Sequence, residues 1–478
     1  MSYAIYIGSD HSRDGHAWLA GYGDEPSSHW LDIVPRSTHE EGAEITVGVT
    51  ADADIPGRLS TIPQARETCR HICVNYSYYK GAPAPLVNGG LNEYGVAVRD
   101  VWSPSRPELT AMTPPEQTGP NYSEQARIAL ARARTAREGI DIIADLIRTH
   151  GEATYGGNSH LIADADEAWV MIQFSGGKGL WAAERLGPSS IRASRPGYIT
   201  IVPVDRPGHP DFLYSDNFVD FAVQQGWYEA GTPFDANRIY GDGKGPWDGV
   251  QWIEAEMADR AARPEKIGFE DMVFAVRSPR LTGDTAGYGQ VVPLNTPGNA
   301  MLRMLWHAPI GPVAAPFAPV FIGQSKVPDE FRKHRYLTTG EDRTFMDNRK
   351  TDDDGPSQLS TVSQTVECSR SAVAACKRLL YLMVQAPDRF AGEVLPVFEA
   401  REAKLADAVA QALAMAEILI GQGKEDLAET LLTYFSCTEL MEGLALVEAL
   451  SAGIEARLRY TERPARTSTA FRAFEQIW

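Results

Sequence analysis

The order of the expected secondary-structure elements is the feature that most constrains how this chain can fold. Short β-type runs come in pairs: Tyr3–Gly8 with Ala17–Tyr22, Val87–Asn92 with Gly95–Val101, and Leu161–Ala163 with Ala168–Phe174. A turn sequence joins the two runs of each pair, which is typical of antiparallel hairpins. We therefore expect antiparallel sheet in the first part of the chain, with a further strand at Trp181-Ala182-Ala183.

Helical patterns lie between these strands and dominate the end of the chain. The spacing of apolar residues predicts a helical stretch over Ser123–His150, capped by Ser123, broken near Thr135 or Gly139, and ended by Gly151. Further helices are expected at Phe269–Arg277 and, after the polar segment Thr351–Pro356, at Ser369–Gln385, Ala400–Ile420 and Lys424–Tyr434. Paired strands combined with helices on either side favour a layered α+β sandwich. We expect one domain over residues 2–345 and a helical C-terminal region over residues 360–478.

Composition narrows the class of protein. The 478 residues are 43% hydrophobic and 23% charged, as in an ordinary globular protein, and the net charge is −18. Such acidity argues against binding to nucleic acids or anionic membranes. No apolar run reaches the roughly 18–20 residues of a membrane span, and no signal-peptide pattern opens the chain. Five scattered cysteines suggest reduced thiols, so we expect a cytoplasmic protein.

The residue most informative about function is Ser2. Residue 2 is small, so methionine aminopeptidase is expected to remove Met1 and leave a hydroxyl and a free α-amine on one residue. An N-terminal nucleophile needs this pair, because the hydroxyl attacks a carbonyl while the amine acts as the base. The ordinary pKa of an α-amine, about 7.7–8.0, suits that role. The alternative is a polar N-terminus without catalytic meaning.

Several motifs, taken in order, carry a resemblance to a known family. They are Ser2, Gly8, Asp14-Gly15, Asp24, Gly89–Ala97, Asn158–Trp169, Trp306–Pro309, Pro316–Phe321 and Val327-Pro328. With these, the chain resembles the dipeptidase A/secernin family of N-terminal-nucleophile (Ntn) hydrolases from residue 2 to about residue 340. The resemblance implies a four-layer αββα sandwich whose first strand presents the nucleophile. Two departures stand out, because the family's N-terminal cysteine falls on Ser2 and an arginine of the family falls on Gly21.

The resemblance also implies roles for individual residues. Asp24 would hold and polarise the amine or hydroxyl of Ser2, although Gly-Asp-Glu-Pro is also a good turn sequence. Asn158 would supply an oxyanion-hole amide, or else be a loop asparagine after two glycines. Arg99 and Asp100 are candidates for substrate contact. Asn92 is interpreted as structural, and no role is assigned to His29, His160 or His307.

The first functional hypothesis is an amide-bond hydrolase with Ser2 as its nucleophile, acting on dipeptides or small N-acyl amides. No metal or organic cofactor is implied, and the expected partner is a small peptide or amide substrate. A homo-oligomer is possible. The second hypothesis is a catalytically inactive, secernin-like binding protein, for which the changes at Ser2 and Gly21 would be the signs of a decayed site. A third is an acylase in which Gly21 opens room for a substrate without a carboxylate.

Overall fold

Two large antiparallel sheets organise the computed structural model, which describes residues 2–24, 29–76, 81–83, 85–283, 286–332 and 370–460. In the described residues the six-stranded sheet has the order β14 (Ile191–Ser194), β1 (Tyr3–Ile7), β2 (Ala17–Gly23), β18 (Tyr288–Leu294), β19 (Met304–Ala308) and β20 (Ala318–Phe321). The eight-stranded sheet has the order β16 (Phe212–Tyr214), β13 (Trp181–Leu186), β12 (Ala168–Gln173), β11 (Asn158–Ala163), β10 (Ala97–Trp102), β9 (Leu86–Asn92), β8 (His71–Tyr76) and β3 (His29–Val34). Three two-stranded pairs lie outside them: β4 (Ser37–Thr38) with β7 (Glu67–Thr68), β5 (Glu44–Val47) with β6 (Ser60–Pro63), and β15 (Ile201–Val202) with β17 (Phe234–Asp235).

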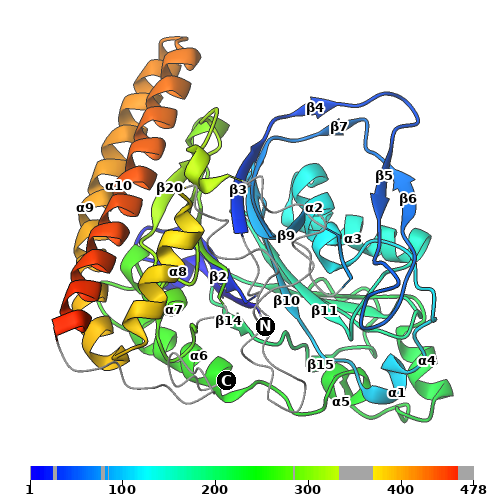
Figure 1. The fold of residues 1–478 in the computed structure, drawn as a ribbon. Coiled ribbons are helices and arrows are strands. Elements are labelled where there is room, and N and C mark those ends of the chain that lie inside the picture. Colours follow the sequence, from blue (N-terminus) through cyan, green and yellow to red (C-terminus); the bar gives the residue numbers. More distant parts are fainter. Residues whose placement is uncertain are drawn as a thin grey trace.

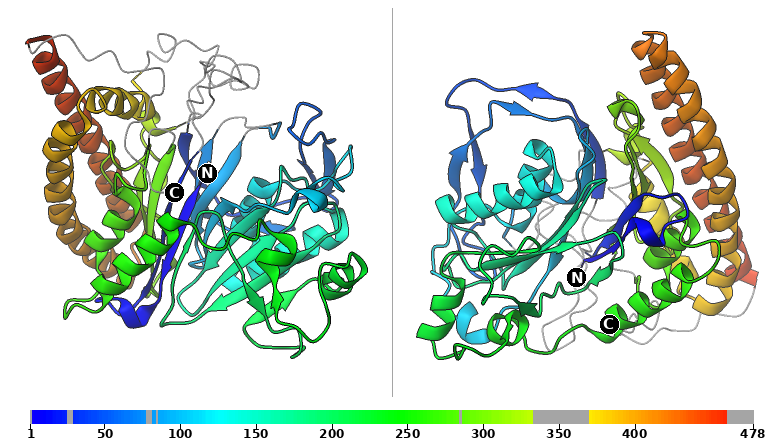
Figure 2. Two further views of the ribbon diagram at one scale, coloured as in Figure 1. Left: turned by 90° about the horizontal axis from the view of Figure 1, so that it is seen from below. Right: turned by 180° about the vertical axis from the view of Figure 1, so that it is seen from behind.

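The helices of the described part cover the outer faces of the two sheets. Helices α2 (Tyr122–Arg132) and α3 (Ala136–His150) lie on the eight-stranded sheet (Figure 1). On the other side are α6 (Asp248–Ala261), α7 (Phe269–Arg277), α8 (Ala372–Met383), α9 (Pro387–Gly421) and α10 (Glu425–Tyr460). Figure 2 shows the long α9–α10 hairpin along one side of the molecule. Shorter helices are α1 (Pro107–Thr110), α4 (Phe218–Gln224) and α5 (Ala236–Tyr240), with 3-10 turns at Ser9–His11, Ala300–Leu302 and Asp329–Phe331.

Strand alternation divides the core into the spaces between these layers. Ala4 of β1 and Leu161 of β11 pack together between the two sheets. Ile162 of β11 packs with the residues of α2 and α3, whereas Ile5 of β1 packs with those of α6 and α7. The result is a helix–sheet–sheet–helix sandwich, so the expected four-layer α+β fold with a helical C-terminal extension is confirmed.

The expected hairpins are confirmed and helices form where local patterns predict them, but one cap differs and the last two helices are longer than expected: α9 begins at Pro387 rather than Ala400, and α10 continues past Tyr434 to Tyr460. β1 pairs with β2, β9 with β10, and β11 with β12, all antiparallel. The helical stretch breaks at Thr135, which caps α3, and Gly151 ends α3 at a φ of 78°. The N-cap of α2 is Asn121 rather than Ser123, because the Asn121 side chain accepts from the backbone N–H groups of Ser123 and Glu124. The Ser123 hydroxyl accepts instead from the Val87 N–H of β9.

The C-terminal helices share a core with the sandwich. Leu379, Phe390 and Leu432 belong to the same apolar cluster as Tyr3 and Ile5 of β1. The polar segment Thr351–Pro356 and the expected boundary between residues 345 and 360 lie outside the described residues. Across the ranges that the structure describes, no helix combines the length and apolarity needed to cross a bilayer.

Candidate active site

Ser2 directly precedes β1 and is 3% exposed. Along β1 the side chains of Tyr3 and Ile5 pack toward the helices α6 and α7, whereas Ala4 and Tyr6 pack between the sheets. Because successive side chains of a strand point to opposite faces, Ser2 shares the face of Ala4 and Tyr6. A hydroxyl on this face is directed into the space between the two sheets.

Asp24 follows the last residue of β2 and is 2% exposed. Its Oδ2 lies 3.1 Å from Nη2 of Arg195, which follows β14 and is itself buried. Arg195 Nη1 also donates to the Tyr22 hydroxyl at 2.8 Å. Since β1 lies between β14 and β2 in the sheet, this ion pair spans the end of β1 at which Ser2 lies.

No sequence motif singles out Arg195. Its place depends on the pairing of β14 with β1, in which Ser194 lies opposite Ala4. That pairing joins segments almost two hundred residues apart, and no local pattern reports it. The only available signal is that Arg195 ends a short strand run before Pro196.

Gly21 has a backbone reason to be glycine. It lies opposite Ala4, and a Cβ on it would come within 2.1 Å of the Tyr3 carbonyl oxygen. A side chain here would therefore push β1 away from β2. This contact contradicts the interpretation that Gly21 opens room for a substrate, because the adjoining strand already occupies that space.

Arg99 and Asp100 are consecutive on β10 and so face opposite sides of the sheet. Asp100 shares the helix-facing side with Val98, and its Oδ1 accepts from Asn88 Nδ2 at 3.1 Å. Arg99 faces the other sheet and is 0% exposed. The structure thus brings Arg99 toward β1 but leaves Asp100 on the far side of the eight-stranded sheet.

The Arg99 guanidinium bridges the two sheets. It donates from Nη1 to the Asn88 carbonyl at 3.0 Å, and from Nη2 to the carbonyls of Tyr22 at 2.8 Å and Tyr3 at 3.4 Å. Its central carbon lies 5.0 Å from the centre of the Tyr288 ring. These contacts hold a buried cation beside the residue that follows Ser2.

Asn158 lies on the helix-facing side of the eight-stranded sheet. It shares a face with His160 and Ile162, and Ile162 packs with residues of α2 and α3. Asn158 Nδ2 is 3.4 Å from both His160 ring nitrogens, and His160 Nε2 is 3.0 Å from the Tyr122 carbonyl. This position does not bring the Asn158 amide to the face shared by Ser2, which removes the geometric basis of an oxyanion contact.

The three histidines near the matched motifs are buried. Burial lowers the pKa of His160 to about 4 and the pKa of His307 to about 3, so both rings are neutral at pH 7. His29 and His307 flank the Tyr288 ring, with centroid separations of 5.8 Å and 6.4 Å. These contacts are aromatic packing between strands.

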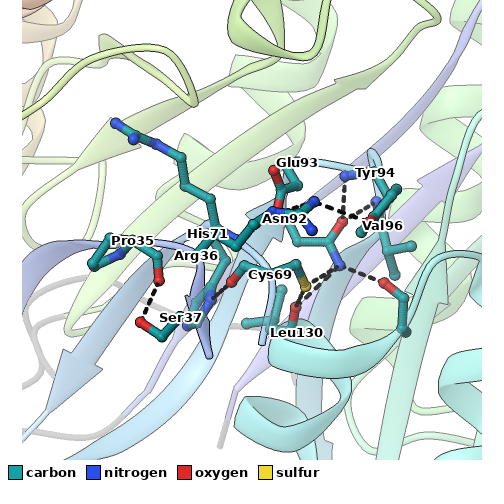
Figure 3. Close-up of polar contacts among 12 residues, drawn as sticks. Pro35, Arg36, Ser37, Cys69, His71, Asn92, Glu93, Tyr94, Val96 and Leu130 are labelled. Atoms are coloured by element: carbon teal, nitrogen blue, oxygen red, sulfur yellow. Dashed lines mark hydrogen bonds and ion pairs between the residues drawn. The ribbon is translucent and has the colours of Figure 1, made fainter. Parts of the chain in front are cut away.

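Part of the sequence pattern that carries the resemblance is a structural device. Figure 3 shows the side chain of Asn92 at the β9–β10 turn. Its Nδ2 donates to the carbonyls of Leu130 at 3.0 Å and Ala133 at 2.7 Å, and its Oδ1 accepts from the N–H groups of Tyr94 and Val96, both at 3.0 Å. Asn92 therefore ties the turn to the end of α2, as a structural residue would.

Asp164 has a similar role in the second motif. Its Oδ1 accepts from the N–H groups of Asp166 at 2.9 Å and Glu167 at 3.0 Å, which shapes the β11–β12 turn. Its Oδ2 accepts from the Ala136 N–H at 2.6 Å, at the first residue of α3. This aspartate satisfies backbone donors that would otherwise be buried without partners.

Comparison with known proteins points to a peptidase. Residues 88–246, about a third of the chain, match the sequence model of Peptidase family C69. The match includes Arg99, Asn158 and Arg195 but not Ser2 or Asp24. It supports an enzyme that hydrolyses C–N bonds, in line with the resemblance to dipeptidase A and secernin.

Solved structures of one hydrolase are also similar. The conjugated bile acid hydrolase from Clostridium perfringens, solved as a mutant, is 11% identical over 68% of this chain and 94% of its own, with a TM-score of 0.31. A variant of the same hydrolase is 10% identical over 68% of this chain and 93% of its own, with a TM-score of 0.30. TM-scores of this size do not establish a shared fold, so the fold assignment rests on the sheets and layers described above.

Proposed function

We propose that the chain is an N-terminal-nucleophile amide hydrolase whose catalytic residue is Ser2, after removal of Met1. The observation that carries the proposal is the position of Ser2: a buried hydroxyl at the start of β1, on the face between the two sheets. The match to a peptidase family supports the reaction class. The proposed substrates are dipeptides or small N-acyl amides.

In the proposed reaction the Ser2 Oγ attacks the amide carbonyl while the Ser2 α-amine takes the hydroxyl proton. The same proton passes to the leaving amine, so that the C–N bond breaks and an acyl ester of Ser2 remains. Water, activated by the amine, then cleaves the ester and regenerates Ser2. We propose that Asp24 orients the amine, supported by its burial and its ion pair with Arg195 at the end of β1. The proposal gives Asn158 no oxyanion role.

The first test is the intact mass of the protein from its native host, followed by a substrate panel. We expect a chain that begins at Ser2 and turns over members of a panel of dipeptides, N-acyl amides and lactams. Ser2→Ala should lower kcat by on the order of 10³-fold or more, because the nucleophile is lost. Ser9→Ala is the matched control, since it removes a hydroxyl from the turn after β1.

The outcomes separate the hypotheses. Turnover that disappears in Ser2→Ala and persists in Ser9→Ala supports the proposal, and preference within the panel separates a peptidase from an acylase. Full activity of Ser2→Ala refutes it. If all molecules retain Met1 and no panel member is turned over, the hypothesis of an inactive binding protein is supported instead.

A further inference from the structure

Arg99 is a charged residue placed where an apolar side chain would ordinarily pack. Its neighbours on the same face of β10, Ala97 and Val101, belong to the apolar cluster between the sheets. Arg99 is 0% exposed in this position. A fully buried guanidinium is costly to desolvate, and an apolar side chain at this position would avoid that cost.

The backbone around Arg99 has the shape to receive its guanidinium. A Cβ on Gly89 would lie 2.9 Å from Arg99 Nη1, so that glycine leaves room for the guanidinium. On the facing sheet, Gly21 packs against the Tyr3 carbonyl oxygen, one of the three carbonyls to which Arg99 donates. Arg99 thus reaches across the sandwich to β1 at the residue after Ser2.

Electrostatics gives this contact a consequence for Ser2. Charged groups near the first residues of β1 include Arg99 on β10, the Arg195–Asp24 ion pair just beyond the flanking strands, and Glu254 on α6. The charge of Asp24 is balanced by its ion pair with Arg195. Burial raises the pKa of Glu254, which disfavours its negative charge. A buried cation disfavours a second positive charge nearby and so lowers the pKa of an adjacent amine.

We propose that Arg99 is a positioning residue for Ser2 and that its charge keeps the Ser2 α-amine in the neutral, basic form. The hydrogen bond to the Tyr3 carbonyl fixes the backbone that carries Ser2, and the guanidinium charge disfavours protonation of the amine. Arg99 then acts on catalysis without touching the substrate, in contrast to the substrate contact expected from the sequence. The inference rests on the proposed function, because it assigns a purpose to the Ser2 amine.

The test compares Arg99→Met, Arg99→Lys and Arg277→Lys with the wild-type chain on the best substrate of the panel. Arg277 is the matched control, because it is also a buried arginine that donates to backbone carbonyls but lies against α9, away from β1. We expect Arg99→Met to lower kcat at least tenfold with little change in KM. It should also raise the acid limb of the pH profile by about one pH unit, because the amine regains its affinity for protons. Arg99→Lys keeps the charge, so the acid limb should stay at its wild-type pH while kcat falls. The control Arg277→Lys should leave the pH profile unchanged.

A second measurement uses the wild-type chain alone, in case Arg99→Met does not fold. Competitive acetylation of the α-amine as a function of pH reports its pKa directly. We expect a value below the ordinary 7.7–8.0. A value within or above that range, or a pH profile that Arg99→Met leaves unchanged, overturns the inference while leaving the hydrolase intact. A wild-type chain that turns over nothing on the panel overturns the proposed function instead.

Discussion

The buried ion pair between Arg277 and Glu402 connects the helical C-terminal region to the sandwich, and its removal gives a quantitative test of that connection. Glu402 of α9 is 3% exposed and accepts from Arg277 Nη1 at 2.6 Å, from Arg277 Nη2 at 2.5 Å, and from the Phe317 N–H at 2.7 Å. Replacing Glu402 by Ala leaves a buried guanidinium without its carboxylate and a buried N–H without its acceptor.

The expected cost follows from these lost contacts. Breaking one partner of a buried ion pair costs about 3–5 kcal/mol, and an orphaned buried N–H costs about 1–3 kcal/mol. The two terms overlap, so we expect Glu402→Ala to lower the free energy of unfolding by about 4 kcal/mol. The double replacement Arg277→Met with Glu402→Met should recover the part of this loss that comes from the uncompensated charge, because apolar residues of similar size remove both buried charges, while the Phe317 N–H still lacks its acceptor.

The assay is urea denaturation followed by far-ultraviolet circular dichroism and tryptophan fluorescence. If α9 and the sandwich unfold together, the two probes should give one coincident transition at lower urea, with an unchanged slope. Glu393→Ala is the control, since Glu393 pairs with Arg389 and Arg457 at the surface and should cost less than about 1 kcal/mol. A loss below 1 kcal/mol in Glu402→Ala, or a separate early transition of the helices, would refute the reasoning.

Three further predictions concern single residues. Arg195→Met should lower kcat/KM, because Asp24 loses the ion pair that holds its carboxylate at the end of β1; an unchanged kcat/KM, measured by steady-state kinetics, would contradict this. Gly21→Ala should lower the melting temperature and destabilise the chain by about 2–3 kcal/mol, since its Cβ would lie 2.1 Å from a carbonyl oxygen of β1. Gly187→Ala is the control and should leave the melting temperature unchanged, because the space around Gly187 is open. Burial raises the pKa of Glu152 to about 8, so its contribution to stability is present below pH 4.5 and lost as pH rises through 8. Glu152→Gln should remove this pH dependence of the free energy of unfolding and make the chain more stable than the wild type at pH 9 by roughly 2 kcal/mol. Denaturation at pH 5 and pH 9 would measure the difference.

The parts of the fold that local patterns determine could be predicted from the sequence. The hairpins around Gly15 and Asp164 have turn residues beside β-type runs, and α7 was expected at its observed bounds. The cap of α2 was expected at Ser123 but lies two residues earlier, at Asn121. The hydroxyl of Ser123 instead accepts a hydrogen bond from β9, a contact that depends on the tertiary packing.

The candidate site could be predicted only in part, because it depends on strand order and on the faces of strands. Ser2 and Asp24 lie at the same end of the six-stranded sheet because β1 pairs with β2, which a hairpin pattern indicates. Arg195 joins them through a pairing over long sequence separation, and Asn158 lies on the helix-facing side through the register of β11. A shift of one residue reverses the face of every side chain in a strand, so a motif alone cannot fix that assignment.

The residues that carry the resemblance therefore have two kinds of role, one in building the fold and one in the proposed chemistry. Asn92 and Asp164 form hydrogen bonds with backbone groups at turns, so their motifs indicate how the eight-stranded sheet is built. The proposed chemistry depends instead on Ser2 and Asp24, which also belong to the resemblance, and on the charges of Arg99 and Arg195 near them. If Arg99 keeps the amine of Ser2 neutral, as proposed, a serine can serve where the resemblance predicts a cysteine, because a serine nucleophile depends more heavily on its base. The Ser2 nucleophile would then depend on the buried charge of Arg99 to keep its amine basic, and the pH profile of Arg99→Met tests this dependence.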